Sequence, residues 1–514
     1  MASRISVGRD ALGLGRHALD SSLVSAADPS APLPSLTVAD VQRSVTAELD
    51  RIGPVIDELG ALFAEAGHEL ALVGGPVRDA MLGRHHNDLD FTTSARPDDT
   101  ERLLKRWARQ DPSGATWDMG RDFGTIGCRR GPWQVEVTTY RSEVYDPTSR
   151  KPDVDFGDSL AGDLVRRDFT VNAMAVRLPG REVVDLYGGV VDLATRTLRT
   201  PGTPEASFSD DPLRMMRAAR FAAQLGFTVA PEVVAAMTEM AERITIISAE
   251  RVRDELVKLV CAPYPRLGLT LLVDTGLADR VLPELPALRL ERDEHHRHKD
   301  VYEHTLTVLE QTMDLEPRLG DGPDFVARFA ALMHDVGKPR TRKFVGDGSV
   351  TFHHHDVVGA KLTRKRMQAL KFSNAEIDAV CQLVEQHLRF HGYGSGEWTD
   401  SAVRRYVRDA GEQLDRLHVL TRADCTTRNR KKAERLARTY DSLEERIARL
   451  SEQEELDSLR PALDGNQIME ILGLRPGREV GEAYRFLLEQ RIESGPMSEQ
   501  EAEAVLRAWW AERR

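Results

Sequence analysis

A short segment near the N-terminus constrains the fold more than any other part of the chain: ELALVGGPVRDAMLGRHHNDLDFTT, residues 69–93. Its apolar run ends in Gly74 and Gly75, which predicts a buried strand followed by a tight turn. Pro76 suits the first turn of a helix, because a backbone N–H has no intrahelical partner there. DLDFTT predicts a second strand, so the segment indicates a domain that mixes strands and helices.

The rest of the chain divides by its hydrophobic pattern into a mixed N-terminal part and a helical remainder. Apolar residues recur every three or four positions over 38–66, which predicts helix, and WQVEVTTYR and REVVDLYGG predict further strands. Beyond residue 205 nearly every apolar pattern is helical. We therefore expect an α/β head followed by a long helical body. Residues 1–45, rich in Ser, Ala, Pro and Gly, are expected to form a disordered extension.

Composition limits the class of protein. A net charge of −12, from 70 Lys and Arg against 82 Asp and Glu, argues against a general nucleic-acid coat protein. The four cysteines form no CxxC pair, which favours reduced thiols in a cytoplasm over a zinc finger or a disulfide scaffold. No apolar run approaches the ~18 residues of a membrane span, and the N-terminus lacks the apolar core of a secretory signal. We expect a cytoplasmic protein with no membrane partner.

Asp88 and Asp90 are two residues apart on a predicted strand, so both carboxylates point to the same face. Their like charges repel, and a pair of Mg²⁺ ions bound together with substrate phosphates would remove that cost. A third carboxylate usually completes a two-metal site, and Glu136 on a later amphipathic strand is the candidate. The glycine turn can also present backbone N–H groups to a phosphate. A solvated strand end and a simple strand-to-helix turn are the structural alternatives.

Further motifs follow in order, and together with GG and DxD they resemble a known family. They are RRDFTVNAMAV (166–176), DDPLRMMRAARFAAQLGF (210–227), ERVRDELVKLV (250–260) and PALDGNQIMEILGLRPGREVG (461–481). LVGGPVRD and DLDFTT are similar to the head motif of nucleotidyltransferases of the DNA polymerase β type. The whole series resembles the class II tRNA nucleotidyltransferases and bacterial poly(A) polymerases, and it spans nearly the whole chain.

The resemblance implies a fold, a division into parts and a set of site residues. The fold is an α+β head with a polymerase-β-like palm, followed by an elongated all-α neck, body and tail. The parts are the extension 1–45, the head 46–200, the neck 201–265, the body 266–430 and the tail 431–514. The catalytic carboxylates are Asp88, Asp90 and Glu136, of which Asp88 and Asp90 bind Mg²⁺. Nucleotide binding is assigned to Gly74, Gly75, Arg78, Arg167, Asp168, Asn172, Asp211, Arg214, Arg217 and Arg220.

Asp211 and Arg214 in DDPLR are three residues apart and share a face at a helix start. An Arg donates and an Asp accepts, so the pair can match the pairing edge of cytosine or adenine, whereas uracil and guanine would leave buried groups unpaired. The resemblance assigns them this template role for CTP and ATP. The structural alternative is an intrahelical ion pair. The guanidinium groups of the arginines in RRDFTVN, and those of Arg217 and Arg220, can each bind triphosphate oxygens through two N–H groups. The structural alternative is a solvated basic face.

The same motifs occur in enzymes that add CCA to tRNA and in enzymes that add poly(A), so they do not separate the two activities. RSEVYDPTSRKPDVDFGDSLAGDLV (141–165) is rich in charge, Gly and Pro, which predicts a flexible loop. In relatives that add CCA, an intact loop here allows the change from CTP to ATP, and this one is full length. Together with the absence of a long basic tail, the loop favours CCA addition with release of pyrophosphate, and poly(A) polymerase is the alternative.

A second metal pattern lies in the helical body. His334 and Asp335 are adjacent in ALMHDVGKPR, with His304 upstream and Asp424 downstream. Imidazole and carboxylate together suit a transition metal such as Mn, Fe, Co, Ni or Zn. The pattern resembles the HD metal-dependent phosphohydrolases, which implies that these four residues bind a metal and that water attacks a phosphate ester. A vestigial HD fold is the alternative. Candidates for second-metal or phosphate contacts are His355, His387 and His391.

Two short stretches are basic despite the acidic total. Residues 361–371 hold five Lys or Arg and no acid, and 428–438 hold six against one Glu. Each is either a solvated helix face or a contact surface for tRNA phosphates, whose binding would weaken with salt. The expected partners are the tRNA 3′ end, CTP and ATP. An HD phosphohydrolase as main or second activity and a non-catalytic RNA-binding protein are the alternatives from other classes.

Overall fold

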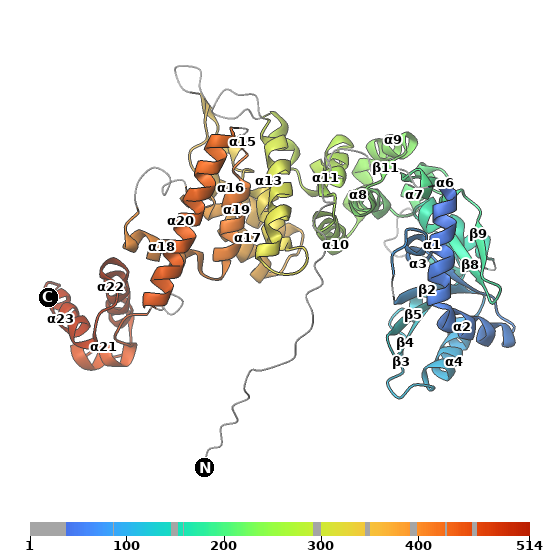
Figure 1. Ribbon diagram of the computed structural model, residues 1–514, viewed down its shortest axis with the longest axis horizontal. Coiled ribbons are helices and arrows are strands. Elements are labelled where there is room, and N and C mark those ends of the chain that lie inside the picture. Colours follow the sequence, from blue (N-terminus) through green and yellow to red (C-terminus); the bar gives the residue numbers. More distant parts are fainter. Residues whose placement is uncertain are drawn as a thin grey trace, which may run out of the picture. The chain divides into compact units, whose positions relative to one another are not determined.

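The head is built on a seven-stranded sheet in the order β3-β4-β5-β2-β1-β8-β9. The computed structural model describes residues 37–85, 87–144, 153–157, 159–290, 300–344, 350–390, 398–426, 429–454 and 460–513. The head elements are α1 (Val38–Arg51), α2 (Gly53–Glu65), β1 (Leu70–Val73), α3 (Gly75–Met81), β2 (Asp88–Thr93), α4 (Pro97–Ala108), β3 (Ala115–Trp117), β4 (Thr125–Arg130), β5 (Trp133–Thr139), β6 (Arg141–Val144), β7 (Asp153–Phe156), α5 (Leu160–Val165), β8 (Met174–Leu178), β9 (Glu182–Asp185) and α6 (Gly189–Ala194) (Figure 1).

The register of this sheet brings separate sequence motifs together. Strand β1 lies between β2 and β8 and is antiparallel to both, and all four of its side chains are buried. Strand β2 is parallel to β5 although two strands lie between them in the sequence. In β2 the aspartates are exposed while Leu89 and Phe91 are buried, so Asp88 and Asp90 share one face of the strand, as predicted.

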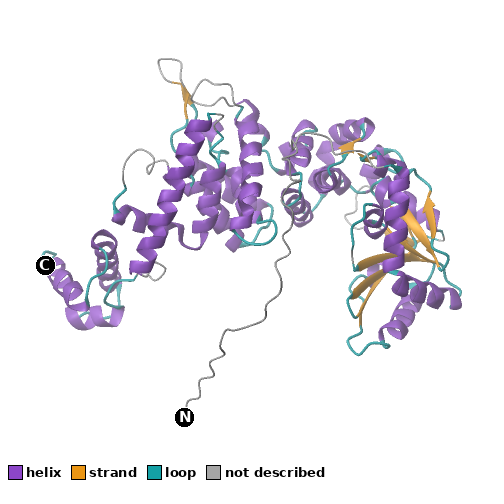
Figure 2. Ribbon diagram, viewed as in Figure 1, coloured by secondary structure: helices purple, strands orange, loops and turns teal. Residues whose placement is uncertain are grey.

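Helical structure follows the head, as predicted (Figure 2). The neck helices are α7 (Pro204–Asp210), α8 (Leu213–Leu225), α9 (Pro231–Met240), α10 (Ala249–Val260), α11 (Pro265–Asp274) and α12 (Ala278–Val281), with the short pair β10 (Thr197–Leu198) and β11 (Thr228–Val229). The body helices are α13 (Val301–Leu315), α14 (Phe325–Met333), α15 (Lys338–Thr341), α16 (His355–Ala369), α17 (Asn374–Gln386), α18 (Asp400–Ala410), α19 (Leu414–Ala423) and α20 (Arg430–Glu454), with the pair β12 (Lys343–Phe344) and β13 (Val350–Thr351). The tail helices are α21 (Gly465–Leu472), α22 (Arg478–Ser494) and α23 (Glu499–Ala511).

Two boundaries, the start of the head and the border between body and tail, differ in the structure from those expected from the sequence. Helix α1 begins at Val38 and buries Val41 and Val45 in the main hydrophobic cluster, so the ordered head begins before residue 46. Helix α20 buries Tyr440 and Leu443 in the same cluster, whereas α21 to α23 form a small core of their own. The body therefore includes α20, and the tail begins after it. Residues 1–36, the greater part of the predicted extension, lie outside the described residues.

Two local expectations need correction. The helical pattern over 38–66 forms two helices, because Pro54 lacks an N–H for an unbroken helix and the chain breaks at Ile52. The segment predicted as a flexible loop forms the antiparallel pair β6–β7, with Arg141 opposite Phe156. Its backbone hydrogen bonds outweigh its loop-like composition; residues 145–152 lie outside the described residues.

Among the residues that the structure describes, none of the helices combines the length and the apolar character that crossing a bilayer requires. The four cysteines all lie in this described part, and none of them forms a disulfide.

Candidate functional site

A cavity of about 550 Å³ opens where the head sheet meets the first neck helices. It is lined by residues of the glycine turn, of β2, of the RRDFT segment and of α8 and α10. Eight arginines face three aspartates in it, so the cavity is strongly cationic and suits a polyanion of nucleotide size. The lining residues are Gly74, Gly75, Arg78, Asp90, Arg141, Arg166, Arg167, Asp168, Asn172, Asp211, Arg214, Arg217, Arg220, Phe221, Gln224 and Arg251.

The three predicted catalytic carboxylates lie on two neighbouring strands. Asp90 on β2 is paired in register with Glu136 on β5, and Asp88 is one pleat repeat away on the same face of β2. Of these three, only Asp90 lines the cavity. Their oxygens do not all lie within 4.8 Å of one another, unlike those of the histidine clusters of the body. The strands therefore place Asp90 and Glu136 at paired positions, with Asp88 on the same face of β2, and Asp90 alone of the three at the cavity.

The electrostatics of Asp90 reflect this crowding. Desolvation by the surrounding cavity atoms, the charge of Glu136 and that of Asp88 raise the pKa of Asp90 to about 6, while Arg167 opposes the rise. The side chain nevertheless remains accessible from the cavity. A carboxylate whose charge is disfavoured in this way gains from a cation bound beside it.

The turn after β1 requires glycine. Gly74 has a φ of 74°, a backbone conformation that other residues rarely adopt. A Cβ atom there would lie 3.0 Å from Nη1 of Arg167. Glycine at this position therefore lets the arginine of the RRDFT segment approach the start of α3, and both line the cavity.

Arg78, Asn172, Asp168 and Arg217 form a continuous polar network along one wall. Arg78 donates from Nη1 to Oδ1 of Asn172 (2.8 Å), and Nδ2 of Asn172 donates to Oδ1 of Asp168 (2.9 Å). Nε of Arg217 donates to Oδ2 of the same carboxylate (2.8 Å). Burial alone would raise the pKa of Asp168, but the charge of Arg217 and the hydrogen bonds lower it to about 2. This carboxylate is thus ionised at neutral pH; it holds Arg217 directly and Arg78 through Asn172.

The predicted template residues Asp211 and Arg214 both reach the cavity but do not pair with each other. Asp211 precedes α8 and accepts from the backbone N–H of Leu213 (3.0 Å). Its other oxygen lies 2.9 Å from Nη2 of Arg251 on α10. The buried Arg214 instead donates to Oγ of Ser207 (2.9 Å) and to the backbone carbonyl of Arg166. The alternative of an intrahelical ion pair is therefore wrong.

Other lining residues differ from the prediction. Arg220 is nearly buried and forms an ion pair with Glu255 of α10, so its charge is largely used within the protein. Its guanidinium lies 3.8 Å from the ring centre of Phe221. Sequence reasoning missed Arg251, although its motif on the neck helix had been recognised. The other lining residues that it missed are Arg141, Arg166, Phe221 and Gln224.

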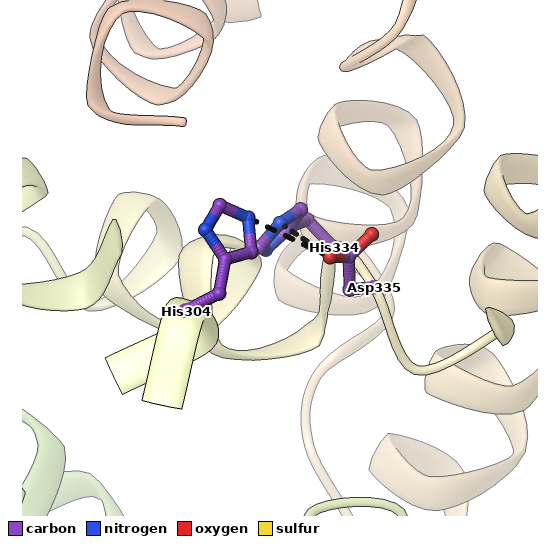
Figure 3. A group of neighbouring side chains, drawn as sticks. All are labelled: His304, His334 and Asp335. Carbon is purple, nitrogen blue, oxygen red and sulfur yellow. Dashed lines mark ion pairs between the residues drawn. The ribbon is translucent and has the colours of Figure 1, made fainter. Parts of the chain in front are cut away.

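The four predicted HD residues converge in the body from three helix regions. His304 comes from α13, His334 and Asp335 directly follow α14, and Asp424 ends α19. Nε2 of His304 lies 3.0 Å from Oδ1 of Asp424 and 3.6 Å from Oδ2 of Asp335. Nε2 of His334 lies 3.2 Å from the same Oδ2 of Asp335 (Figure 3). His304, His334 and Asp335 each offer a ligand atom within 4.8 Å of the others.

Charge in this site favours a cation. Burial would lower the pKa of His334, yet the charges of Asp335 and Asp424 raise it to about 8. Burial would likewise raise the pKa of Asp424, but the hydrogen bond from His304 and the charge of His334 lower it. The negative potential that stabilises a protonated imidazole would equally attract a metal ion. Of the three further histidines, His355 and His387 lie beside Asp335 in a second group, and His391 lies outside the described residues.

The two basic stretches lie on helices. The first lies on α16 from Lys361 and ends just beyond it at Lys371, and the second, from Arg430, forms the exposed first turns of α20. Arg430, Lys431, Lys432, Arg435 and Arg438 are exposed there.

Comparison with protein families matches three successive regions of the chain. The Poly A polymerase head domain matches residues 70–199, and the probable RNA and SrmB-binding site of polymerase A matches 226–288. The HD domain matches residues 301–429, which contain the histidine and aspartate cluster described above.

Comparison with characterised proteins finds relatives that add nucleotides to tRNA and relatives named CCA-adding enzymes. An A-adding tRNA nucleotidyltransferase of Deinococcus radiodurans is 35% identical over 85% of this chain and 95% of its own. A CCA-adding enzyme of Levilactobacillus brevis is 44% identical over 45% of this chain and 55% of its own. The solved Bacillus stearothermophilus CCA-adding enzyme in complex with CTP is 26% identical, with a TM-score of 0.64 over 89% of this chain and 97% of that one.

Proposed function

The chain belongs to the tRNA nucleotidyltransferase family, and from this premise we propose that it adds C, C and A to the 3′ end of tRNA from CTP and ATP, with release of pyrophosphate. The observation that carries the proposal is the arginine-lined cavity with Asp90 in its wall. It joins a site for a triphosphate to carboxylates that can hold the metal ions of phosphoryl transfer.

The carboxylates fit Mg²⁺ by their chemistry. Asp88, Asp90 and Glu136 offer only oxygen donors, they lie side by side on β2 and β5, and Asp90 carries a charge that its surroundings disfavour. Bound Mg²⁺ would supply activation of the attacking hydroxyl and stabilisation of the leaving pyrophosphate. We assign Asp88 and Asp90 as the ligands and Glu136 as the third carboxylate.

The arginines would orient the triphosphate for in-line attack. The tRNA 3′-oxygen forms a bond to the α-phosphorus, and the bond from that phosphorus to the pyrophosphate oxygen breaks. Arg78, Arg167 and Arg217 present guanidinium groups to the cavity, and Asp168 with Asn172 fixes Arg78 and Arg217. Asp168 and Asn172 also offer polar atoms to the ribose. Arg220, tied to Glu255, would contribute mainly through the positive potential of the cavity.

Base selection would rest on Asp211 and Arg214, without a nucleic-acid template. The carboxylate of Asp211 would accept from the exocyclic amine of cytosine or adenine, and Arg214 would donate to a ring nitrogen or to O2. Arg251 holds one oxygen of Asp211 in place, so the carboxylate is oriented before a nucleotide arrives. Uracil and guanine present donors and acceptors in the wrong sense and would leave buried groups unpaired.

An assay with two different acceptor RNAs distinguishes complete CCA addition from addition of A alone. One relative with broad coverage is A-adding, whereas the alignment to a CCA-adding relative spans about half of that relative. Purified protein should be incubated with tRNA lacking CCA and with tRNA ending in CC, each with CTP, ATP or both. We expect C addition to the first and A addition to the second. Failure to add C, or long tails from ATP alone, would contradict the proposal.

The tRNA and the cellular location follow as parts of the same proposal. The exposed basic residues at the start of α20 and those of 361–371 would contact the tRNA backbone, whose shape gives recognition without base readout. Four cysteines without a disulfide agree with a cytoplasmic location.

A second candidate function is metal-dependent hydrolysis of a phosphate ester in the HD domain. It is favoured by the convergence of His304, His334 and Asp335 within 4.8 Å, with Asp424 beside them. The donor set of nitrogen and oxygen suits Mn, Co or Ni. Release of phosphate from a chromogenic phosphate ester by the protein loaded with one of these ions, and its loss in His334→Ala, would support it; equal release by both proteins would contradict it.

A further inference from the structure

A single row of residues crosses the carboxylate face of the head sheet from the cavity to the outer edge of the sheet. Asp90 on β2 is paired with Glu136 on β5. Glu136 is paired in turn with Gly127 on β4, and Gly127 with Trp117 on the edge strand β3. Residues paired across neighbouring strands project to the same face of a sheet. Because neighbouring strands lie about 4.8 Å apart, the backbone of Trp117 is about 14 Å from that of Asp90. An aromatic side chain therefore stands in line with the two carboxylates.

The side chain of Trp117 lies back along this row, over Gly127. A Cβ atom at Gly127 would lie 2.0 Å from Nε1 of the indole and 2.1 Å from its Cε2. Glycine is therefore required at this position, because any side chain would displace the ring. With its ring over β4, the indole is one strand from Glu136 and about 10 Å from Asp90. Trp117 is half-buried, so one side of the ring rests on the sheet and the other side is open.

The two faces of strands β3, β4 and β5 differ in what they carry. On one face, Ile126 is buried beneath α4, whose Leu104 and Trp107 belong to the same hydrophobic cluster. On the carboxylate face, Arg129 and Gln134 are exposed and are paired across β4 and β5. The carboxylate face thus offers a cation and a flat aromatic surface, and this combination binds the backbone and the bases of a single-stranded nucleic acid.

Nucleotidyl transfer requires the acceptor strand and the triphosphate to approach from opposite sides. In an in-line displacement, the attacking hydroxyl and the leaving pyrophosphate lie on opposite sides of the phosphorus. Arg78 on α3 and Arg167, shortly before β8, line the cavity from segments next to β1 and β8. These two strands lie on one side of β2, and β5, β4 and β3 lie on the other. With the triphosphate on the side of these arginines, the acceptor would reach Asp90 across β4 and β5.

We propose that the indole of Trp117 is a stacking platform for a base of the tRNA acceptor end, with Arg129 beside it as a contact for the RNA backbone. A distance of about 10 Å from Asp90 corresponds to about three stacked nucleotides at about 3.4 Å each, so the stacked base lies a few positions before the reacting 3′-hydroxyl. Stacking accepts any base, which suits an acceptor whose last nucleotides change at each addition. The inference rests on the proposed function for the identity of the acceptor as tRNA.

The binding of two matched RNAs tests the platform without any assay of nucleotide addition. One RNA is a tRNA that ends in CC, and the other is the same tRNA shortened to its last base pair, without a single-stranded end. For the full chain, Trp117→Ala should raise the Kd of the first RNA about tenfold and leave that of the second within about twofold, because only the first offers a base to stack. Trp117→Phe should retain most of the binding. Leu186→Ala, an exposed apolar residue at the opposite edge of the sheet, is the control and should change neither Kd.

Photochemical crosslinking tests the contact itself. A tRNA ending in CC, with a 5-iodopyrimidine at each of its last three positions in turn, should be bound to the full chain and irradiated. We expect a crosslink in the peptide that contains Trp117, and its loss in Trp117→Ala. An unchanged KM for CTP in this variant would show that the head remains folded.

Other outcomes separate the claims. An equal change in Kd for both RNAs, or no change for either, would overturn the platform, as would crosslinks confined to other peptides. A raised KM for CTP with unchanged tRNA binding would assign the indole to the incoming nucleotide and would also overturn it. If the difference in Kd and the crosslink are both found in a protein that does not add CCA, the platform is retained and the proposed activity alone is contradicted.

Discussion

The head and the HD domain each bring acidic side chains to one point, but they do so with different chemistry. In the head, carboxylates lie on adjacent strands beside a cavity rich in arginine, and their donors are oxygens. In the HD domain, buried histidines from several helices surround Asp335, and most donors are nitrogens. The first arrangement suits Mg²⁺ with a triphosphate, and the second suits a transition metal held largely by the protein.

The two sites also differ in how well their geometry can be predicted from the sequence. A spacing of two on a strand puts Asp88 and Asp90 on the same face wherever the strand lies. The residues His304 and Asp424 are far apart in the sequence, and only the packing of α13 against α19 brings them within 3.0 Å. The Asp88–Asp90 pair is therefore local in origin, whereas the HD cluster depends on tertiary packing.

The largest expected effect is that of Asp90→Asn on nucleotide addition. Loss of a metal-ligating charge should lower kcat by about 1,000-fold or more, because even one donor to developing charge contributes about 10²–10³-fold. Single-turnover addition of CMP to tRNA measures the change. Metal content of the HD domain should be unaltered, and Asp122→Asn, exposed and outside the cavity, is the control. If Asp90→Asn lost the metal of the HD domain as well as nucleotide addition, the two sites would not be independent.

The reverse variant, His334→Ala, should affect only the HD domain. Removal of a direct ligand should weaken transition-metal binding by about 100-fold or more, since outer partners of metal ligands alone contribute about 10–100-fold. Nucleotide addition should stay within about twofold. Dialysis with Co²⁺ and the addition assay give both quantities, with His353→Ala as the exposed control. A parallel loss of addition would show that the two sites are coupled.

Much of the head and part of the site could be predicted from sequence, for physical reasons that particular residues make clear. Strand β1 and strand β2 have short-range patterns, and both formed as predicted. The partner of Asp211 could not be predicted, because Arg251 lies on a helix that reaches the cavity only through neck packing. The β6–β7 pair was missed since its composition favours a loop and its stability comes from cross-strand hydrogen bonds. The sequence identified the histidines as candidate metal ligands. It could not show which buried Nε2 atoms lack a hydrogen-bond partner among the described residues, because that depends on the fold.

Asp168 of the head differs from the aspartates of the HD domain, whose partners are histidines. Its partner Arg217 stays charged over the accessible pH range. With a folded-state pKa of about 2 against an ordinary value of 3.8, the carboxylate stabilises the fold above pH 4 by about 2 kcal/mol, and this contribution is lost as pH falls through about 2. Asp168→Asn should therefore lower the free energy of unfolding at pH 7 by about that amount. Denaturant unfolding between pH 7 and pH 3 should show the difference from the unaltered protein shrinking toward acid. A difference independent of pH would contradict the assigned charge pairing.

The smallest effect concerns Arg251, which positions Asp211 without belonging to the predicted template. Arg251→Ala should reduce the preference for CTP over UTP by about fivefold at most, because an exposed ion pair such as Arg251–Asp211 contributes up to about 1 kcal/mol. Competition between the two nucleotides in the addition assay measures it. Lys258→Ala, exposed on the same helix, should leave the preference unchanged. An equal effect of both variants would indicate a general effect of helix α10.

The central claim, that the head cavity directs complete CCA addition, is tested most directly by one measurement. A tRNA lacking its three terminal nucleotides should be incubated with all four nucleoside triphosphates at equal concentration and Mg²⁺, and the 3′ ends of the products should be sequenced. We expect 3′ ends that read CCA and stop there. Ends extended only where CC was already present, or runs of A, would contradict it.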